Sequence, residues 1–102
     1  MSTSREAWLR EEARLIILKA LAEQTDETLI SSMIERELRE RFGIRRDRSW
    51  VHGELDWLAE HGAITVTDAG TVKVAVLAER GRRHIDREIA IEGVRRPSRP
   101  EA

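Results

Sequence analysis

Three arginines, Arg45, Arg46 and Arg48, cluster just before an apolar helical pattern that includes Val51. A guanidinium group can hold a phosphate through two parallel hydrogen bonds, and the free amides at a helix N-terminus also attract phosphate. The cluster therefore favours contact with a nucleic-acid backbone, with Arg45 and Arg46 as phosphate anchors and Arg48 as a candidate reader of base edges. The alternative is a solvated basic loop between two acidic helices.

Side chains that could carry out catalysis or hold a metal ion are sparse. The 102 residues contain no Cys, which excludes thiolate metal sites, thiol redox chemistry and disulfides. His52, His61 and His84 are isolated in the sequence, and there is no glycine-rich phosphate loop. We therefore expect a protein that is not an enzyme and that uses no metal ion or cofactor.

The segments that must position the arginine cluster begin with two helices. Residues 4–22 place apolar side chains at helical spacing, which predicts a long helix. After a possible very short strand at Thr28–Ile30, a second helix ends at Gly43, with Ser32 and Glu35 as its capping box. The side chains expected to face inward from this helix are Ile30, Met33, Ile34, Leu38 and Phe42.

A third helix follows the arginine cluster directly. Asp47 is a suitable N-cap, and Val51, Leu55 and Leu58 form an apolar stripe behind it. The dipeptide His61-Gly62 closes this helix, because glycine readily adopts the left-handed conformation found after helix ends.

The pattern then changes to the alternation typical of a β-hairpin. Ile64 and Val66 alternate with threonines, and a turn is expected at Asp68-Ala69-Gly70. We expect the valines at 72, 74 and 76 to face the core, with Lys73 on the outward face beside Thr65, Thr67 and Thr71. From Ala78 the helical pattern returns, with three apolar side chains turned inward: Leu77, Ile85 and Ile89.

The order helix, helix, helix, hairpin, helix is that of a winged helix-turn-helix domain, which is mainly α with a β-hairpin. We expect this domain to span residues 1–92 and a flexible basic tail to span 93–102, where Gly93 and both prolines interrupt the pattern. Residues 80–102 carry seven arginines against four acidic side chains. Three of these arginines are candidate tail contacts to DNA or to an acidic partner: Arg95, Arg96 and Arg99.

The exposed face of the third helix is expected to carry Ser49, Trp50, His52 and Gly53; the alternative for Trp50 is that its side chain folds back onto the core. The candidate DNA-binding residues are therefore Arg45, Arg46, Arg48, Ser49, Trp50, His52 and Lys73. The formal net charge is −1, so the whole domain is not basic and DNA binding would rest on local clusters. Acidic side chains on the same helix favour a second hypothesis, a winged helix that docks on another protein without binding DNA: Glu54, Asp56 and Glu60.

Several motifs resemble one known family. They are Arg46-Asp47-Arg48, Leu55-Asp56-Trp57-Leu58-Ala59-Glu60-His61-Gly62, Val74-Ala75-Val76-Leu77, Glu79-Arg80-Gly81 and Gly93-Val94-Arg95-Arg96-Pro97. Together they resemble the small winged-helix proteins of Mu-like transposable phages and prophages, commonly described as helix-turn-helix or ArsR-like. The resemblance covers nearly the whole chain and implies a phage-encoded DNA-binding protein of the host cytoplasm, either a regulator of transcription or an accessory factor in a DNA transaction. Under the second hypothesis, the docking partner is a phage or host protein. The chain departs from the family pattern at Ala78, where a Thr is expected, and at Trp50 and His52, where arginines are expected.

The remaining expectations concern the oligomeric state and the cellular location of the protein. The longest aliphatic run is Leu15-Ile16-Ile17-Leu18, which is too short to span a membrane. Trp8, Ile89 and Ile91 are large apolar residues near the two ends of the domain, and a lone domain of this size has a small footprint on DNA. We therefore expect a cytoplasmic homodimer on duplex DNA, with these residues at its interface; the alternative is that they pack together within one monomer.

Overall fold

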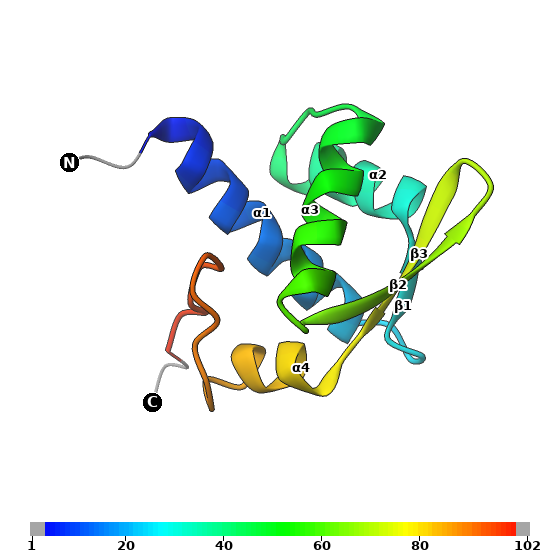
Figure 1. The fold of residues 1–102 in the computed structure, drawn as a ribbon. Coiled ribbons are helices and arrows are strands. Elements are labelled where there is room, and N and C mark those ends of the chain that lie inside the picture. Colours follow the sequence, from blue (N-terminus) through cyan, green and yellow to red (C-terminus); the bar gives the residue numbers. More distant parts are fainter. Residues whose placement is uncertain (1–3, 100–102) are drawn as a thin grey trace.

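The computed structural model describes residues 4–99 of the 102-residue chain. The elements follow the expected order of a winged helix, including the short strand after the first helix (Figure 1). They are α1 (Arg5–Ala22), β1 (Thr28–Ile30), α2 (Ser31–Phe42), α3 (Arg48–Glu60), β2 (Ile64–Ala69), β3 (Val72–Leu77) and α4 (Glu79–Ile85).

Side-chain caps and one left-handed glycine set three of the helix ends. The Ser4 side chain accepts a hydrogen bond from the backbone amide of Ala7 at the start of α1. Asp47 accepts one from the amide of Trp50 at 2.9 Å, which confirms it as the N-cap of α3. Gly43 ends α2 with a φ of 67°, a conformation that glycine adopts without steric cost.

The start of α2 differs from the expectation, because the capping box of Ser32 and Glu35 does not form. Strand β1 runs directly into the helix, so Ile30 takes the N-cap position with extended backbone and no side-chain cap. The expected inward set is also wrong in part. Ile34 and Leu38 are buried, but Ile30, Met33 and Phe42 are among the exposed large apolar side chains.

The three strands form an antiparallel sheet in the order β1-β3-β2, with the hairpin turn at Gly70-Thr71 (Figure 1). Its register corrects the prediction of which hairpin face is buried. Val66 pairs with Ala75, and Asp68 pairs with Lys73. Directly paired residues share one face of a sheet, and so do alternate residues of one strand. Lys73 therefore lies on the same face as the buried Ala75. The valines at 72, 74 and 76 instead lie on the other face, together with Thr65 and Thr67.

The chain after β3 is less helical than expected but closely packed. Helix α4 ends at Ile85, and the irregular segment beyond it turns back beside α1, where the amide of Arg95 donates to the carbonyl of Glu11. His84 is fully buried; its Nε2 donates to the carbonyl of Arg95, and its Nδ1 accepts from the amide of Ile91.

A flexible tail was predicted from Gly93 onwards. In the structure, Val94 belongs to the hydrophobic core and Pro97 is also buried, because these apolar side chains remove surface from water against the helices. The last part of the predicted tail, residues 100–102, lies outside the described residues.

Helix α1 packs one side against the centre of the core and leaves the other side partly exposed. Its buried side chains Ile17, Leu18 and Leu21 pack in one cluster with residues of α2, α3 and the sheet, among them Ile34, Leu38, Val51, Leu55, Leu58 and Ala75. Figure 1 shows α3 lying in front of α1, with the hairpin of β2 and β3 projecting beside it. Within residues 4–99, none of the helices is long and apolar enough to cross a membrane.

Candidate nucleic-acid interface

The outward face of α3 combines cationic and small side chains in its first half. Ser49 and Gly53 are exposed opposite the buried stripe of Val51 and Leu55, and Arg48 is exposed at the first position of the helix. Asp56 and Glu60 continue the exposed face toward the end of the helix. A Cβ atom added at Gly53 would meet no atom within 4 Å, so this point of the helix backbone is open to a close approach.

Two of the three predicted arginines are available at the entrance of α3. Arg45 and Arg48 are exposed and, among residues 4–99, form no ion pair. Arg48 is the first residue of the helix, so its side chain lies beside the free backbone amides of the first turn. Two free cations thus lie within four residues of each other in the sequence at a helix N-terminus.

The third arginine, Arg46, is held by Glu6 of α1. Its Nη2 lies 2.8 Å from Glu6 Oε1, and the indole Nε1 of Trp50 donates to Glu6 Oε2 at 2.9 Å. The guanidinium of Arg46 also lies 5.6 Å from the centre of the Trp50 ring. Trp50 is therefore half-buried and folded toward α1, and both predicted contact residues are engaged within the chain.

The hydrogen bond from Trp50 and the charge of Arg46 lower the pKa of the Glu6 carboxyl below its ordinary value of 4.5. A carboxylate with a lowered pKa stabilises the fold above its ordinary pKa, and the contribution is lost as the pH falls through the lowered value. We expect Glu6→Gln to be less stable than the wild type at pH 7, with the difference shrinking below pH 4.5. Urea unfolding at several pH values checks this, and an equal difference at pH 3 and pH 7 would contradict it.

Glu54, predicted as part of an acidic surface, is instead buried, with only 2% of its area exposed. Its Oε1 accepts a hydrogen bond from Arg14 Nε at 2.7 Å, and its Oε2 lies 3.1 Å from Arg10 Nη1. Arg14 also donates to the carbonyl of Gly93 at 2.8 Å and stacks on the Trp57 ring at 3.8 Å. This buried network joins α1, α3 and the C-terminal segment, and it removes one negative charge from the outward face of α3.

Lys73 is not a free cation on the hairpin. Its ammonium lies 2.7 Å from Asp68 and 3.4 Å from Asp56, and its side chain is only 18% exposed. The hydrogen bond to Asp68 raises the pKa of Lys73 and lowers that of Asp68. Lys73 therefore shares its single positive charge between an acidic side chain of α3 and one of the hairpin, a role that differs from the predicted phosphate contact.

Sequence reasoning missed Ser31, which joins the hairpin to α3. The Ser31 hydroxyl is buried; it accepts a hydrogen bond from the backbone amide of Lys73 at 2.9 Å and lies 3.0 Å from Nε2 of His52. His52 is consequently half-buried rather than free on the surface. Nothing in the sequence signals this joint, because its three residues are far apart along the chain.

The predicted tail and dimer residues have different environments. Arg95 forms an ion pair with Glu12 at 3.1 Å, whereas Arg96 and Arg99 are exposed and have no ion-pair partner among residues 4–99. Of the proposed dimer residues, Trp8 is 53% exposed and Ile89 is half-buried against the core. Ile91 is only 2% exposed because it packs in the core, so its prediction as an interface residue is wrong.

Among the described residues, no three His, Cys, Asp or Glu side chains come together as metal ligands.

Comparison with known proteins finds one relative by sequence and several by structure. The chain is 33% identical over 94 residues to the uncharacterized protein gp26 of Escherichia phage Mu, covering 92% of this chain and 95% of that protein. No protein-family model matches.

Two of the similar solved structures illustrate the fold. RosR of H. salinarum superposes with a TM-score of 0.65 at 21% identity, over 74% of this chain and 67% of that one. F93 from STIV, described as a winged-helix DNA-binding protein, has a TM-score of 0.60 at 22% identity, over 85% of this chain and 87% of its own. These likenesses establish the winged-helix fold.

Proposed function

Because the chain belongs to the same family as gp26 of phage Mu and has a winged-helix fold, we propose that it is a phage protein that binds duplex DNA through the first half of α3. Exposed Arg45 and Arg48 at the entrance of that helix carry the proposal, since both are free of ion pairs within residues 4–99. Arg48 is the candidate reader of a base edge in the major groove, and Arg45 is the candidate phosphate anchor.

The remaining predicted contact residues take revised roles in this proposal. Ser49 is exposed beside Arg48 and can donate to a phosphate or a base. Arg46 and Trp50 hold the start of α3 against α1, and His52 and Lys73 hold α3 to the hairpin. They act as positioning residues. Arg96 and Arg99 stay predictions as additional phosphate contacts.

The burial of Glu54 favours DNA binding over the alternative of protein docking alone. The alternative rested on three acidic side chains of α3: Glu54, Asp56 and Glu60. Glu54 is buried with Arg14, so the first half of the exposed face has no unpaired carboxylate beyond the capping Asp47. Asp56, in the second half, lies 3.4 Å from the Lys73 ammonium. Glu60 is exposed only in the last turn. Phosphates can therefore approach the arginines without crossing a negative surface.

The winged-helix neighbours add support by analogy, since F93 from STIV is itself described as a DNA-binding protein. A regulatory role, in which the protein controls transcription of phage genes or assists another DNA transaction, is part of the proposal. Selection of bound fragments from phage and host DNA checks this role. A regulator is expected to enrich a few discrete sites, and uniform enrichment across the genome would contradict site-specific regulation.

Removing the two free arginines tests the interface. We expect the double variant Arg45→Ala, Arg48→Ala to bind duplex DNA at least about tenfold more weakly, since a bidentate base contact alone contributes about 1–3 kcal/mol. The slope of log affinity against log salt is expected to become shallower by about 0.9 for each lost phosphate contact. Fluorescence anisotropy with labelled duplexes measures both.

The matched control removes two arginines from α4, Arg80→Ala with Arg83→Ala, at the opposite end of α3 from Arg48 (Figure 1). It makes the same change in net charge, so general electrostatic attraction falls equally in both variants. If the two double variants bind DNA with the same affinity, the arginines at the entrance of α3 do not form the interface.

A further inference from the structure

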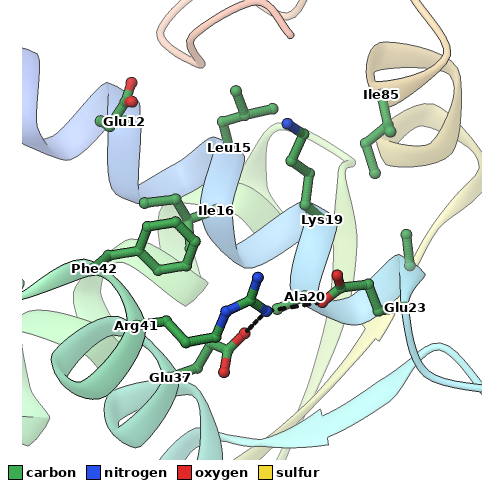
Figure 2. Close-up of a pocket in the computed structure, with 11 residues that line it drawn as sticks. Glu12, Leu15, Ile16, Lys19, Ala20, Glu23, Glu37, Arg41, Phe42 and Ile85 are labelled. Carbon is green, nitrogen blue, oxygen red and sulfur yellow. Dashed lines mark hydrogen bonds and ion pairs between the residues drawn. The ribbon is translucent and has the colours of Figure 1, made fainter.

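A groove of about 560 Å³ lies between α1, the end of α2 and α4 (Figure 2). Figure 2 shows Phe42 beside Ile16, and Arg41 between Glu37 and Glu23. The apolar lining consists of Leu15, Ile16, Ala20, Ala22, Phe42 and Ile85, and charged side chains form the rim. Phe42 is among the exposed large apolar side chains, so the groove leaves part of an aromatic ring in water.

The same helix that forms the groove also carries the most exposed tryptophan. Arg5, Trp8, Glu12, Leu15 and Lys19 follow one another along α1 at spacings of three and four residues, which places them on one face of the helix. Trp8 is 53% exposed near one end of this face, and the groove lies toward the other end. One helix thus offers both an aromatic projection and an apolar recess.

We propose that two copies of the chain pair through antiparallel α1 helices, with Trp8 of each copy entering the groove of the other. An antiparallel pair with its two-fold axis between Glu12 and Leu15 brings Trp8 opposite Lys19 and Ala20 of the other copy. The small Ala20 leaves room for an indole between Ile16 and Phe42, and the Lys19 ammonium can lie over the indole face.

The charges along α1 fit this antiparallel arrangement. Arg5, which has no ion-pair partner among residues 4–99, lies opposite Glu23 of the other copy. Glu23 is at 3.4 Å from Arg41, which binds Glu37 more closely at 2.7 Å, so one carboxylate oxygen of Glu23 remains available. A parallel pair would place Arg5 against Arg5 and leave both grooves empty. Since each copy gives and receives the same contacts, the interface closes at two copies.

This interface replaces the predicted one, which included the buried Ile91, and it does not depend on DNA binding. Trp8 keeps its predicted role. Ile89 does not contribute, because it packs against the core of its own chain and does not line the groove.

Disulfide crosslinking tests the antiparallel geometry, since the natural chain has no Cys. Within one copy, residues 5 and 23 are separated by roughly 27 Å along a helix, far beyond the ~7 Å between Cα atoms that a disulfide allows. The variant with both Arg5→Cys and Glu23→Cys is therefore expected to form a covalent dimer on mild oxidation, and each single variant to stay uncrosslinked. Absence of a covalent dimer in the double variant, or equal crosslinking by Arg5→Cys alone, would overturn the antiparallel pair.

Sedimentation equilibrium at micromolar concentration tests the role of Trp8. The wild type is expected at twice the monomer mass and Trp8→Ala at the monomer mass. Met33→Ala, which removes a similarly exposed apolar side chain on α2 outside the groove, is expected to remain dimeric. Circular dichroism confirms that both variants are folded. A monomeric wild type, or a Trp8→Ala variant as dimeric as the wild type, would overturn the proposal. The wild type would be monomeric if a different molecule occupied the groove.

Discussion

Replacing Glu54 by alanine is expected to lower the free energy of unfolding by about 3–5 kcal/mol, the usual cost of removing one partner from a buried ion pair. The carboxylate holds Arg14 at 2.7 Å inside the fold and also binds Arg10. Without it, the buried Arg14 guanidinium keeps only the Gly93 carbonyl and the face of Trp57. Such a loss is a large fraction of the 5–15 kcal/mol that typical domains have. Chemical denaturation measures it.

Two further variants separate the ion pair from general effects of the substitution. Glu60→Ala removes the same side chain from the exposed face of the same helix and is expected to change stability by less than about 0.5 kcal/mol. Replacing both partners, Arg14→Met with Glu54→Leu, removes both buried charges and is expected to recover most of the loss. If Glu54→Ala is no more destabilising than Glu60→Ala, Glu54 is not part of a buried pair.

Replacing Gly81 by alanine is expected to destabilise the fold by about 1–3 kcal/mol, the range found for overpacked cores. A Cβ atom at this position would lie 2.3 Å from the carbonyl oxygen of Ala63 and 2.8 Å from a methyl carbon of Leu77. The Ala63 carbonyl accepts a hydrogen bond from the amide of Ala78, so it cannot move away without cost. Thermal unfolding with denaturant titration measures the change.

Gly53→Ala provides the matched comparison, because Gly53 also lies inside a helix but nothing approaches its Cβ position within 4 Å. Alanine stabilises an open helical position by up to about 1 kcal/mol relative to glycine. The two Gly-to-Ala variants are therefore expected to shift stability in opposite directions. A stabilised Gly81→Ala variant would contradict the close packing of α4 against the loop before β2.

The helices and the order of the elements could be predicted because their signals are local. Asp47 caps α3 through an amide three residues away, and Gly43 ends α2 through its own backbone conformation. The buried hairpin face was predicted wrongly because alternation marks two faces without saying which one meets the helices. The valines suggested the core face, but the small Ala75 and its partner Val66 occupy it.

The candidate site was predictable only where its residues are free of tertiary contacts. Arg45 and Arg48 are exposed beside the start of α3, as their position in the sequence indicated. Arg46 and Trp50 were assigned to DNA, but Glu6 binds both from a helix about forty residues earlier. Such contacts between distant segments depend on the packing of α1 against α3, which periodicity does not reveal.

Equilibrium binding of the intact wild-type chain to duplex DNA across salt concentrations tests the central claim most directly. Each phosphate neutralised by an arginine contributes about 0.9 to the slope of log affinity against log salt. With Arg45 on a phosphate and Arg48 on a base edge, we expect measurable binding near 50 mM salt and a linear decrease with a slope of at least about 0.9 per chain. Absence of binding at the lowest salt, or binding that does not change with salt, would contradict the assignment of this surface to DNA.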